Sequence, residues 1–188
     1  MNREQWLELA TTELRALFKQ HGYILPERVR SSCGFPSKSA LSAKNRRIGE
    51  CWSAKASADS YAEIFISPTL SDSSRVLDIL AHELIHALHP GAGHGKAFKR
   101  TASAIGLEGK MTATVAGEAF KQWAKPVIER LGAYPHAELI PANARKKQST
   151  RMLKCYCSEC GYTVRVAGKW LEDMGAPHCP YHGEMQSV

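Results

Sequence analysis

The segment AHELIHALHPGAGHGKAF, residues 81–98, contains four of the eight histidines of the 188-residue chain. On an α-helix, residues four positions apart lie on one face, so His82 and His86 can present two imidazoles to one ion. This is the spacing of the zinc-binding HExxH helix, in which Glu83 stands beside the first ligand without binding the metal. Zinc lowers the pKa of a bound water to near 7, and the carboxylate takes its proton as the water attacks an amide carbonyl. The pattern therefore predicts a catalytic zinc site.

A catalytic zinc keeps three protein ligands and leaves one position open. His89 follows His86 on the same helix, whereas His94 comes after the turn PGAG and opens the next helix. A ligand that returns from a turn approaches the ion from a new direction, so we expect His94 as the third ligand. Glu108 and Glu118 are the less favoured substitutes. We expect His89 to cap the end of its helix, where histidine interacts favourably with the helix dipole.

The alternative to a metal site is a helix whose histidines are ordinary polar residues. The residues around His82 and His86 are apolar almost all round the helix: Leu80, Ala81, Leu84, Ile85, Ala87 and Leu88. Two imidazoles and a carboxylate on a largely buried helix need polar partners. A metal ion supplies those partners at once, so the composition of this helix favours the metal site.

A second group of metal-ligating residues lies near the C-terminus. Cys157-x2-Cys160 is followed, after 18 residues, by Cys179-x2-His182. Paired ligands at this spacing are typical of a zinc ribbon, in which each pair wraps one side of a tetrahedral ion. Four protein ligands close the site, so we predict a structural role and a total of two zinc ions per chain. Cys155 and His178 remain alternatives for a place in this site.

The formal net charge of +7 is unevenly distributed along the chain. Residues 26–55 contain seven Lys or Arg and two Glu, and residues 140–170 contain seven basic residues and one acid. The intervening segment 56–90 is acidic. Two basic blocks favour a polyanion as partner, and solvated surface without a partner is the alternative. Tyr156, Tyr162 and Trp170 add stacking groups near the ribbon that suit nucleic acid, although we expect Trp170 to belong to the ribbon's own core.

Hydrophobic periodicity indicates the elements that position these residues. We predict helices over residues 1–18, with Trp6, Leu9, Leu14 and Leu17 on the apolar face, and over 75–88, 95–106 and 117–131, the last bent or divided at Pro126. Strands are expected within 23–35, near 48–52, over 61–66 and over 162–168. The predicted organisation is a domain over 1–134, a basic linker over 135–151 and a zinc-ribbon module over 152–188. No secretion signal or apolar run of about 20 residues is present, so we expect an intracellular, cytoplasmic protein without a membrane partner.

Together, HELIHALHPGAGHGKAF and the following ribbon resemble the SprT-like metallopeptidases, the group that includes the Spartan proteases acting on proteins crosslinked to DNA. The resemblance implies an α+β fold, a small zincin-like domain whose HExxH helix lies beside a short mixed sheet, with a C-terminal zinc ribbon. It implies that His82, His86 and His94 bind the catalytic zinc and that Glu83 is the general base. It also implies DNA as a partner, single-stranded or duplex with an exposed single strand, and DNA-bound proteins as substrates. The ribbon departs from the family pattern in having His182 where a fourth cysteine is more familiar.

Two other functions agree with the same residues. One is a DNA-binding zinc protein whose HExxH site is structural or vestigial, which predicts salt-sensitive binding to nucleic acid and no proteolysis. The other is a zinc hydrolase that acts on a bond other than a peptide. The presence of Glu83 between the two histidines favours the peptidase, because a binding protein needs no glutamate there.

Overall fold

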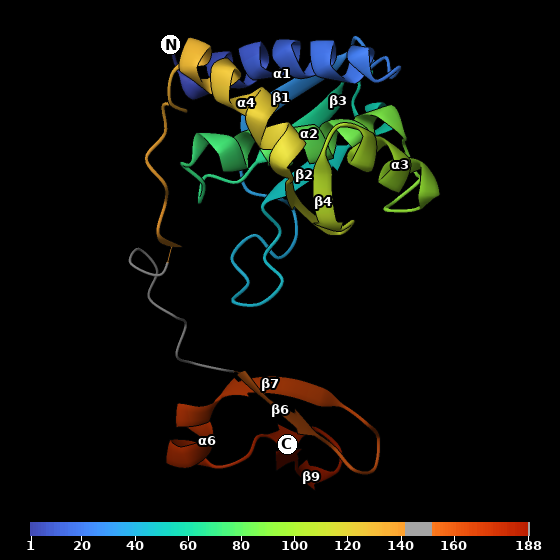
Figure 1. The fold of residues 1–188 in the computed structure, drawn as a ribbon. Coiled ribbons are helices and arrows are strands. Elements are labelled where there is room, and N and C mark those ends of the chain that lie inside the picture. The colour runs from blue at the N-terminus through green and yellow to red at the C-terminus, as the bar shows by residue number, and fades with distance from the viewer. Residues whose placement is uncertain (142–151, 188) are drawn as a thin grey trace. The chain divides into compact units, whose positions relative to one another are not determined.

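The computed structural model describes residues 1–141 and 152–187, and the chain divides into two compact units, 1–141 and 142–188. The described residues contain five α-helices, four in the first unit and one in the second, together with small β-sheets in each unit (Figure 1). Residues 142–151 of the expected basic linker, with Arg145, Lys146, Lys147 and Arg151, lie outside the described residues.

A three-stranded mixed sheet forms the base of the first unit. It comprises β1 (Val29–Cys33), β2 (Gly49–Trp52) and β3 (Ala62–Ile66) in the order β1-β3-β2. β3 runs parallel to β1 and antiparallel to β2, so β2 is an edge strand. Alternate residues of β3 are buried (Ala62, Ile64 and Ile66), and this agrees with the period-2 pattern in the sequence. The short mixed sheet that the resemblance implies is therefore present.

Helices cover one face of this sheet. α1 (Arg3–Gln20) contacts β1, α2 (Ser73–Leu88) contacts β2 and β3, and α4 (Glu118–Leu131) packs against both helices (Figure 1). Side-chain caps fix the starts of α1 and α2: Asn2 accepts a hydrogen bond from Gln5 N–H, and Asp72 accepts one from Arg75 N–H. The predicted helices at the N-terminus, over 75–88 and over 117–131 are confirmed with small shifts in their ends. Leu9 is 46% exposed, however, so its assignment to the apolar face was wrong.

The polypeptide after α2 forms the wall beside the HExxH helix. α3 (Lys96–Ala104) begins after Gly95, as expected, and is followed by an antiparallel hairpin of β4 (Leu107–Lys110) and β5 (Ala113–Ala116). β5 packs against α2. This hairpin was not predicted, because four-residue strands carry too little periodicity to be recognised in the sequence. α4 continues through Pro126, which does not divide it.

Residues that follow α4 lie along the first unit. The ring of Tyr134 packs on Trp6 with centroids 5.1 Å apart, His136 Nε2 lies 2.9 Å from the carbonyl oxygen of Pro68, and Leu139 N–H donates to the same oxygen. The predicted linker begins at residue 135, and these contacts place its first residues against the first unit.

The second unit is a small β-structure with one helix in its described residues. β6 (Met152–Tyr156) pairs antiparallel with β7 (Thr163–Ala167) and β10 (Gln186–Ser187). α6 (Gly168–Met174) follows β7, and β8 (His178–Cys179) pairs with β9 (Gly183–Glu184). Among residues 152–187, the buried hydrophobic cluster has four members: Cys155, Cys157, Cys179 and Met185. The described residues of the chain contain no helix that is long and apolar enough to cross a membrane.

Candidate metal centres

Three histidines converge between α2 and the start of α3. His94 Nε2 lies 3.2 Å from the Nε2 atoms of both His82 and His86. The first two come from successive turns of α2, and the turn after His89 returns the chain so that His94 faces them from the other side. Phe98 underlies all three rings, with ring centroids 4.8–4.9 Å from theirs. The Phe98 side chain is fully buried, and its packing against the three imidazole rings restricts their movement.

The separation of the three nitrogens matches a zinc ion. Ligands arranged tetrahedrally at Zn–N distances of about 2.0–2.1 Å lie about 3.3–3.4 Å from one another. The observed 3.2 Å is close to this value, and the ligand atoms of the three residues lie within 4.8 Å of one another. Three imidazoles leave the fourth position of a tetrahedral ion for water or substrate, so the arrangement fits a catalytic site.

Burial keeps these imidazoles in the form that binds metal. Burial, with added repulsion from the neighbouring histidines, lowers the pKa of His82 to about 3 and that of His86 to about 4. Burial and the charge of Arg47 also lower the pKa of His94. All three rings are therefore neutral near pH 7, and neutral imidazole is the ligand form.

Glu83 lies one residue from His82 and is 6% exposed. Burial raises the pKa of its carboxyl group to about 8, against the opposing effect of Arg47. A Cβ atom on Gly49 of β2 would lie 2.5 Å from Glu83 Oε1 and 2.7 Å from Ile79 Cγ2. Because Gly49 has no side chain, there is room for the Glu83 carboxylate between α2 and the edge strand β2. A metal ion at the neighbouring histidines would oppose the effect of burial on Glu83 and favour the ionised carboxylate, which can accept a proton and return it.

Thr114 lies at the histidine site, and the sequence patterns did not reveal it. It lies on β5, is 4% exposed, and its Oγ1 is 2.8 Å from His82 Nδ1. If Nε2 binds a metal ion together with the other imidazoles, Nδ1 carries the proton and donates to the threonine hydroxyl. A contact of this kind orients the ring of His82 and would fix its tautomer when a metal binds at Nε2. Because β5 was not predicted, nothing in the sequence indicated that Thr114 lies near His82.

An ion pair holds β5 against α2. Arg75 Nη1 donates to Asp78 at 2.8 and 2.9 Å and to the carbonyl oxygen of Thr114 at 3.1 Å. Asp78 Oδ2 also accepts from Ala116 N–H at 3.1 Å. Asp78 is 4% exposed, so removing Arg75 would leave a buried carboxylate without its main partner. These contacts position Thr114 and, through it, His82.

The other candidate ligands lie elsewhere. His89 is the C-cap residue of α2, and its Nε2 lies 2.9 Å from Thr101 Oγ1. The carboxylate of Glu108 lies beside Gly117, and Glu118 forms an exposed ion pair with Lys121. Among the described residues, the group of ligand atoms at this site consists of His82, His86 and His94.

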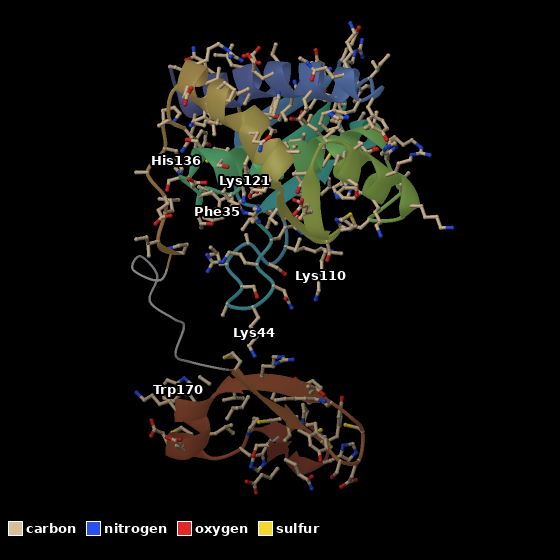
Figure 2. All side chains as sticks on the ribbon, in the orientation of Figure 1. Phe35, Lys44, Lys110, Lys121, His136 and Trp170 are labelled. Atoms are coloured by element: carbon tan, nitrogen blue, oxygen red, sulfur yellow. The ribbon has the colours of Figure 1, made fainter. Side chains whose placement is uncertain are left out.

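The histidines and Glu83 border a cleft of about 900 Å³. Arg46 and Arg47, from the segment between β1 and β2, line it together with Lys110 of β4. Lys44 occupies the tip of that segment, and Lys110 lies on the hairpin (Figure 2). Arg47 Nη1 donates to Glu50 Oε1 at 2.5 Å, so the segment is tied to the edge strand β2. The mouth of the cleft is therefore basic.

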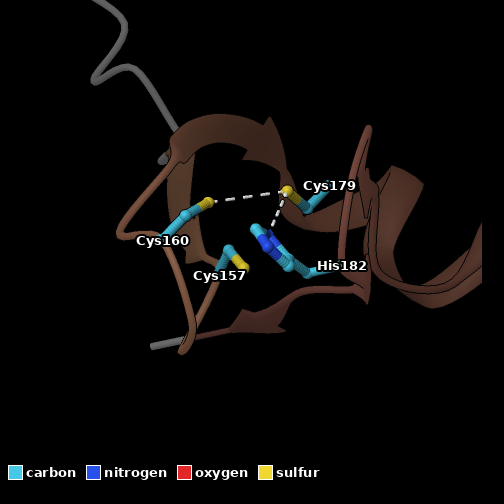
Figure 3. A group of neighbouring side chains, drawn as sticks. All are labelled: Cys157, Cys160, Cys179 and His182. Atoms are coloured by element: carbon cyan, nitrogen blue, oxygen red, sulfur yellow. Dashed lines mark hydrogen bonds between the residues drawn. The ribbon is translucent and has the colours of Figure 1, made fainter.

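The second unit brings together Cys157, Cys160, Cys179 and His182 (Figure 3). Cys160 Sγ lies 3.7 Å from Cys179 Sγ, and Cys179 Sγ lies 3.5 Å from His182 Nδ1. Thiolates at about 2.3 Å from a tetrahedral zinc lie about 3.8 Å apart, and a thiolate and an imidazole about 3.5 Å apart. The observed distances fit both values, so this group suits a structural zinc.

The alternatives at the ribbon are outside this group. Cys155 is fully buried in the small core of the unit, and His178 is exposed on β8.

Hydrogen bonds lower the pKa of the Cys179 thiol to about 6, and the hydrogen bond from the Tyr181 backbone has the largest effect. A thiol with such a pKa is largely thiolate at pH 7, which is the form that binds zinc. Trp170 is 54% exposed, so the expectation that it belongs to the ribbon core was wrong.

A family model described as the SprT-like family matches residues 28–131, which is more than half of the chain. The chain belongs to the SprT-like family. The matched segment extends from the residue before β1 to the end of α4 and so includes the three histidines, Glu83 and Thr114. The SprT-like segment excludes α1 and the ribbon. Comparisons with curated proteins and with solved structures gave no match.

Proposed function

We propose that this SprT-like chain is a zinc-dependent endopeptidase with a zincin-like catalytic unit, and that it acts on proteins bound or crosslinked to DNA. Three imidazole nitrogens spaced for zinc, with a buried carboxylate next to the first of them in one open cleft, support this function most directly. Membership of the SprT-like family is consistent with it.

His82, His86 and His94 would hold the catalytic zinc. When bound there, zinc would supply a Lewis acid that polarises the scissile carbonyl and makes a water acidic near neutral pH. Glu83 takes the proton from the attacking water and returns it to the leaving amine as the peptide bond breaks. Thr114 keeps the His82 ring in the orientation that this site needs.

The edge strand β2 offers a place for the substrate backbone. It lies beside α2, and Gly49, Glu50 and Cys51 line the same cleft as Glu83. An edge strand has one side that pairs within the sheet and one that can pair with an extended peptide. The backbone of a polypeptide bound to β2 in this way would run alongside the three histidines.

Basic and exposed aromatic side chains of the second unit support DNA as a partner. Lys154 and Arg165 are opposite one another in the β6–β7 pair, and Tyr156 lies two residues further on the same face. Exposed Tyr162 and Trp170 add stacking surfaces, with Lys169 Nζ 5.3 Å from the Trp170 ring centroid. Positive charge beside exposed aromatic rings suits single-stranded nucleic acid.

The same basic surfaces would also serve a DNA-binding zinc protein that cleaves nothing. The two functions are separated by digestion of a basic DNA-binding protein with the purified, zinc-loaded chain, with and without single-stranded DNA, beside the variant Glu83→Gln. We expect cleavage that DNA stimulates and that the variant loses by at least about a hundredfold. If neither protein cleaves the substrate while both bind DNA, the chain is the binding protein.

A further inference from the structure

An aromatic pocket of about 480 Å³ lies on the face of the mixed sheet opposite the helices. Glu50 pairs with Phe65, and Trp52 with Glu63, so these four side chains share one face of β2 and β3. Phe35 also lines the pocket, and the short helix η1 (Ala54–Ala56) contributes Ala56. Phe35 and Trp52 are 42% and 44% exposed, so their rings are open to a ligand.

Carboxylates and aromatic rings alternate around this pocket. Glu50 accepts hydrogen bonds from Ser37 N–H, the Ser37 hydroxyl and the Trp52 indole N–H at 2.7–3.0 Å, which orients the indole ring. Glu63 accepts from Arg30, which also pairs with Asp59. Three carboxylates thus share two guanidinium groups, those of Arg30 and Arg47, and the described residues that line the pocket include no cationic side chain. The pocket therefore carries an excess of negative charge in a chain of net charge +7.

We propose that this pocket binds a cationic side chain, lysine or arginine, of a polypeptide. A cation held against aromatic rings gains from the negative charge of the ring faces, and nearby carboxylates add to the attraction. The same sheet face already holds one such contact, because the Arg30 guanidinium lies 4.4 Å from the centroid of the Tyr61 ring. A phosphate would meet Glu50 and Glu63 without a cation among the described lining residues, so a nucleic acid backbone fits less well.

Glu50 lines both the pocket and the cleft that holds Glu83, so the two lie on either side of β2. Successive side chains of an extended peptide point to opposite faces of a sheet. A substrate paired with β2 would direct some of its side chains towards the histidines and its alternate side chains towards Trp52. On the proposed endopeptidase function, on which this role rests, the pocket selects substrates with a basic residue beside the bond that is cut.

The proposal can be tested by an NMR titration of the full zinc-loaded chain carrying Glu83→Gln. The readout is the indole N–H signal of Trp52, which the variant Trp52→Phe assigns. The probes are a short neutral peptide with one central lysine, the same peptide with glutamine in that place, and a short oligothymidylate. We expect the lysine peptide to shift the signal with about fivefold tighter binding than the glutamine peptide. Phe35→Ala and Ala56→Lys should each remove this difference, the first by deleting a ring and the second by placing a cation in the pocket.

Equal binding of the two peptides, or binding that neither variant changes, would overturn the proposal. A larger shift with the oligothymidylate would assign the pocket to nucleic acid instead. Because the titration uses a chain that lacks Glu83, selective lysine binding stands even if the wild-type chain cleaves no peptide. Failure of the peptidase function is read separately, from digestion by the wild-type chain.

Discussion

The histidine site depends on residues that do not themselves touch the three converging nitrogens. Glu83 fits beside β2 only because residue 49 is glycine, and His82 is oriented by Thr114. The HExxH motif predicted the residues of α2 from helical spacing alone. Neither Gly49 nor Thr114 could be predicted, because their roles arise from strands that pack against α2 from distant parts of the sequence.

Gly49→Ala tests the position of Glu83. The added methyl group would overlap the carboxylate and Ile79, so we expect a loss of peptidase activity of about a hundredfold or more. Zinc content should stay unchanged, because the histidines are not displaced. Gly168→Ala is the matched control, since its Cβ would meet only Leu153 at an ordinary 3.7 Å. Equal activity of both variants would show that Glu83 tolerates displacement.

Thr114→Val tests the orientation of His82. It removes the hydroxyl at nearly constant shape, and we expect the affinity of the histidine site for zinc to fall about 10- to 100-fold. Competition with a chelator measures this affinity. Thr114→Ser keeps the hydroxyl and should bind zinc almost as tightly as the wild type. An unchanged affinity in the valine variant would mean that the contact with His82 is incidental.

At the scale of elements, helices were better predicted than short strands. α2 and α4 have long apolar stripes and clear ends, whereas the β4–β5 hairpin has strands of four residues each. The segment between β1 and β2 had no recognisable pattern, yet Glu50 fastens it through Ser37 and Arg47. The contact between Ser37 and Glu50 joins residues 13 positions apart, and local sequence patterns do not reveal it.

Glu50→Gln should loosen this segment. Burial alone would raise the pKa of Glu50, but hydrogen bonds from Ser37, Arg47 and Trp52 outweigh burial and lower it. The ionised carboxylate therefore stabilises the fold at neutral pH, and this contribution is lost as pH falls below the ordinary value of 4.5. We expect the variant to lose about 1–3 kcal/mol of unfolding free energy at pH 7.

Urea unfolding at a fixed free zinc concentration measures this difference at pH 7 and again near pH 4. The difference in unfolding free energy between wild type and Glu50→Gln should narrow at the lower pH, because below about 4.5 the unfolded chain takes up a proton at residue 50 that the folded chain, with its lowered pKa, takes up less readily. A difference in unfolding free energy that stays constant or widens at the lower pH would show that the stabilisation by Glu50 does not depend on its charge.

At the scale of the whole molecule, the two units differ in what holds them together. The first has a continuous core built from α1, α2, α4 and the mixed sheet, whereas the described residues of the second bury a cluster of four hydrophobic side chains. Two of the metal-site cysteines, Cys157 and Cys179, belong to that cluster together with Cys155. A core this small does not fold without a further constraint, and a zinc ion held by Cys157, Cys160, Cys179 and His182 would supply one.

Removal of zinc should therefore affect the units differently. We expect a strong chelator to collapse the dispersed amide NMR signals of residues 152–187, while signals of buried core residues such as Leu80 and Ile64 persist. Cys160→Ser should reproduce the effect on the second unit alone. Loss of the signals of both units would contradict independent stabilisation, and a fully folded second unit would contradict a structural role for zinc.

The central claim is that the three histidines hold a zinc ion with which Glu83 breaks peptide bonds. Its most direct test is the return of peptidase activity as zinc is added to the metal-free chain, measured beside the zinc bound per chain for wild type, Glu83→Gln and His94→Ala. We predict that wild type binds two zinc ions and regains activity. Glu83→Gln should bind two and stay inactive, and His94→Ala should bind fewer than two and stay inactive. Full activity of either variant, or activity in the metal-free wild type, would contradict the account.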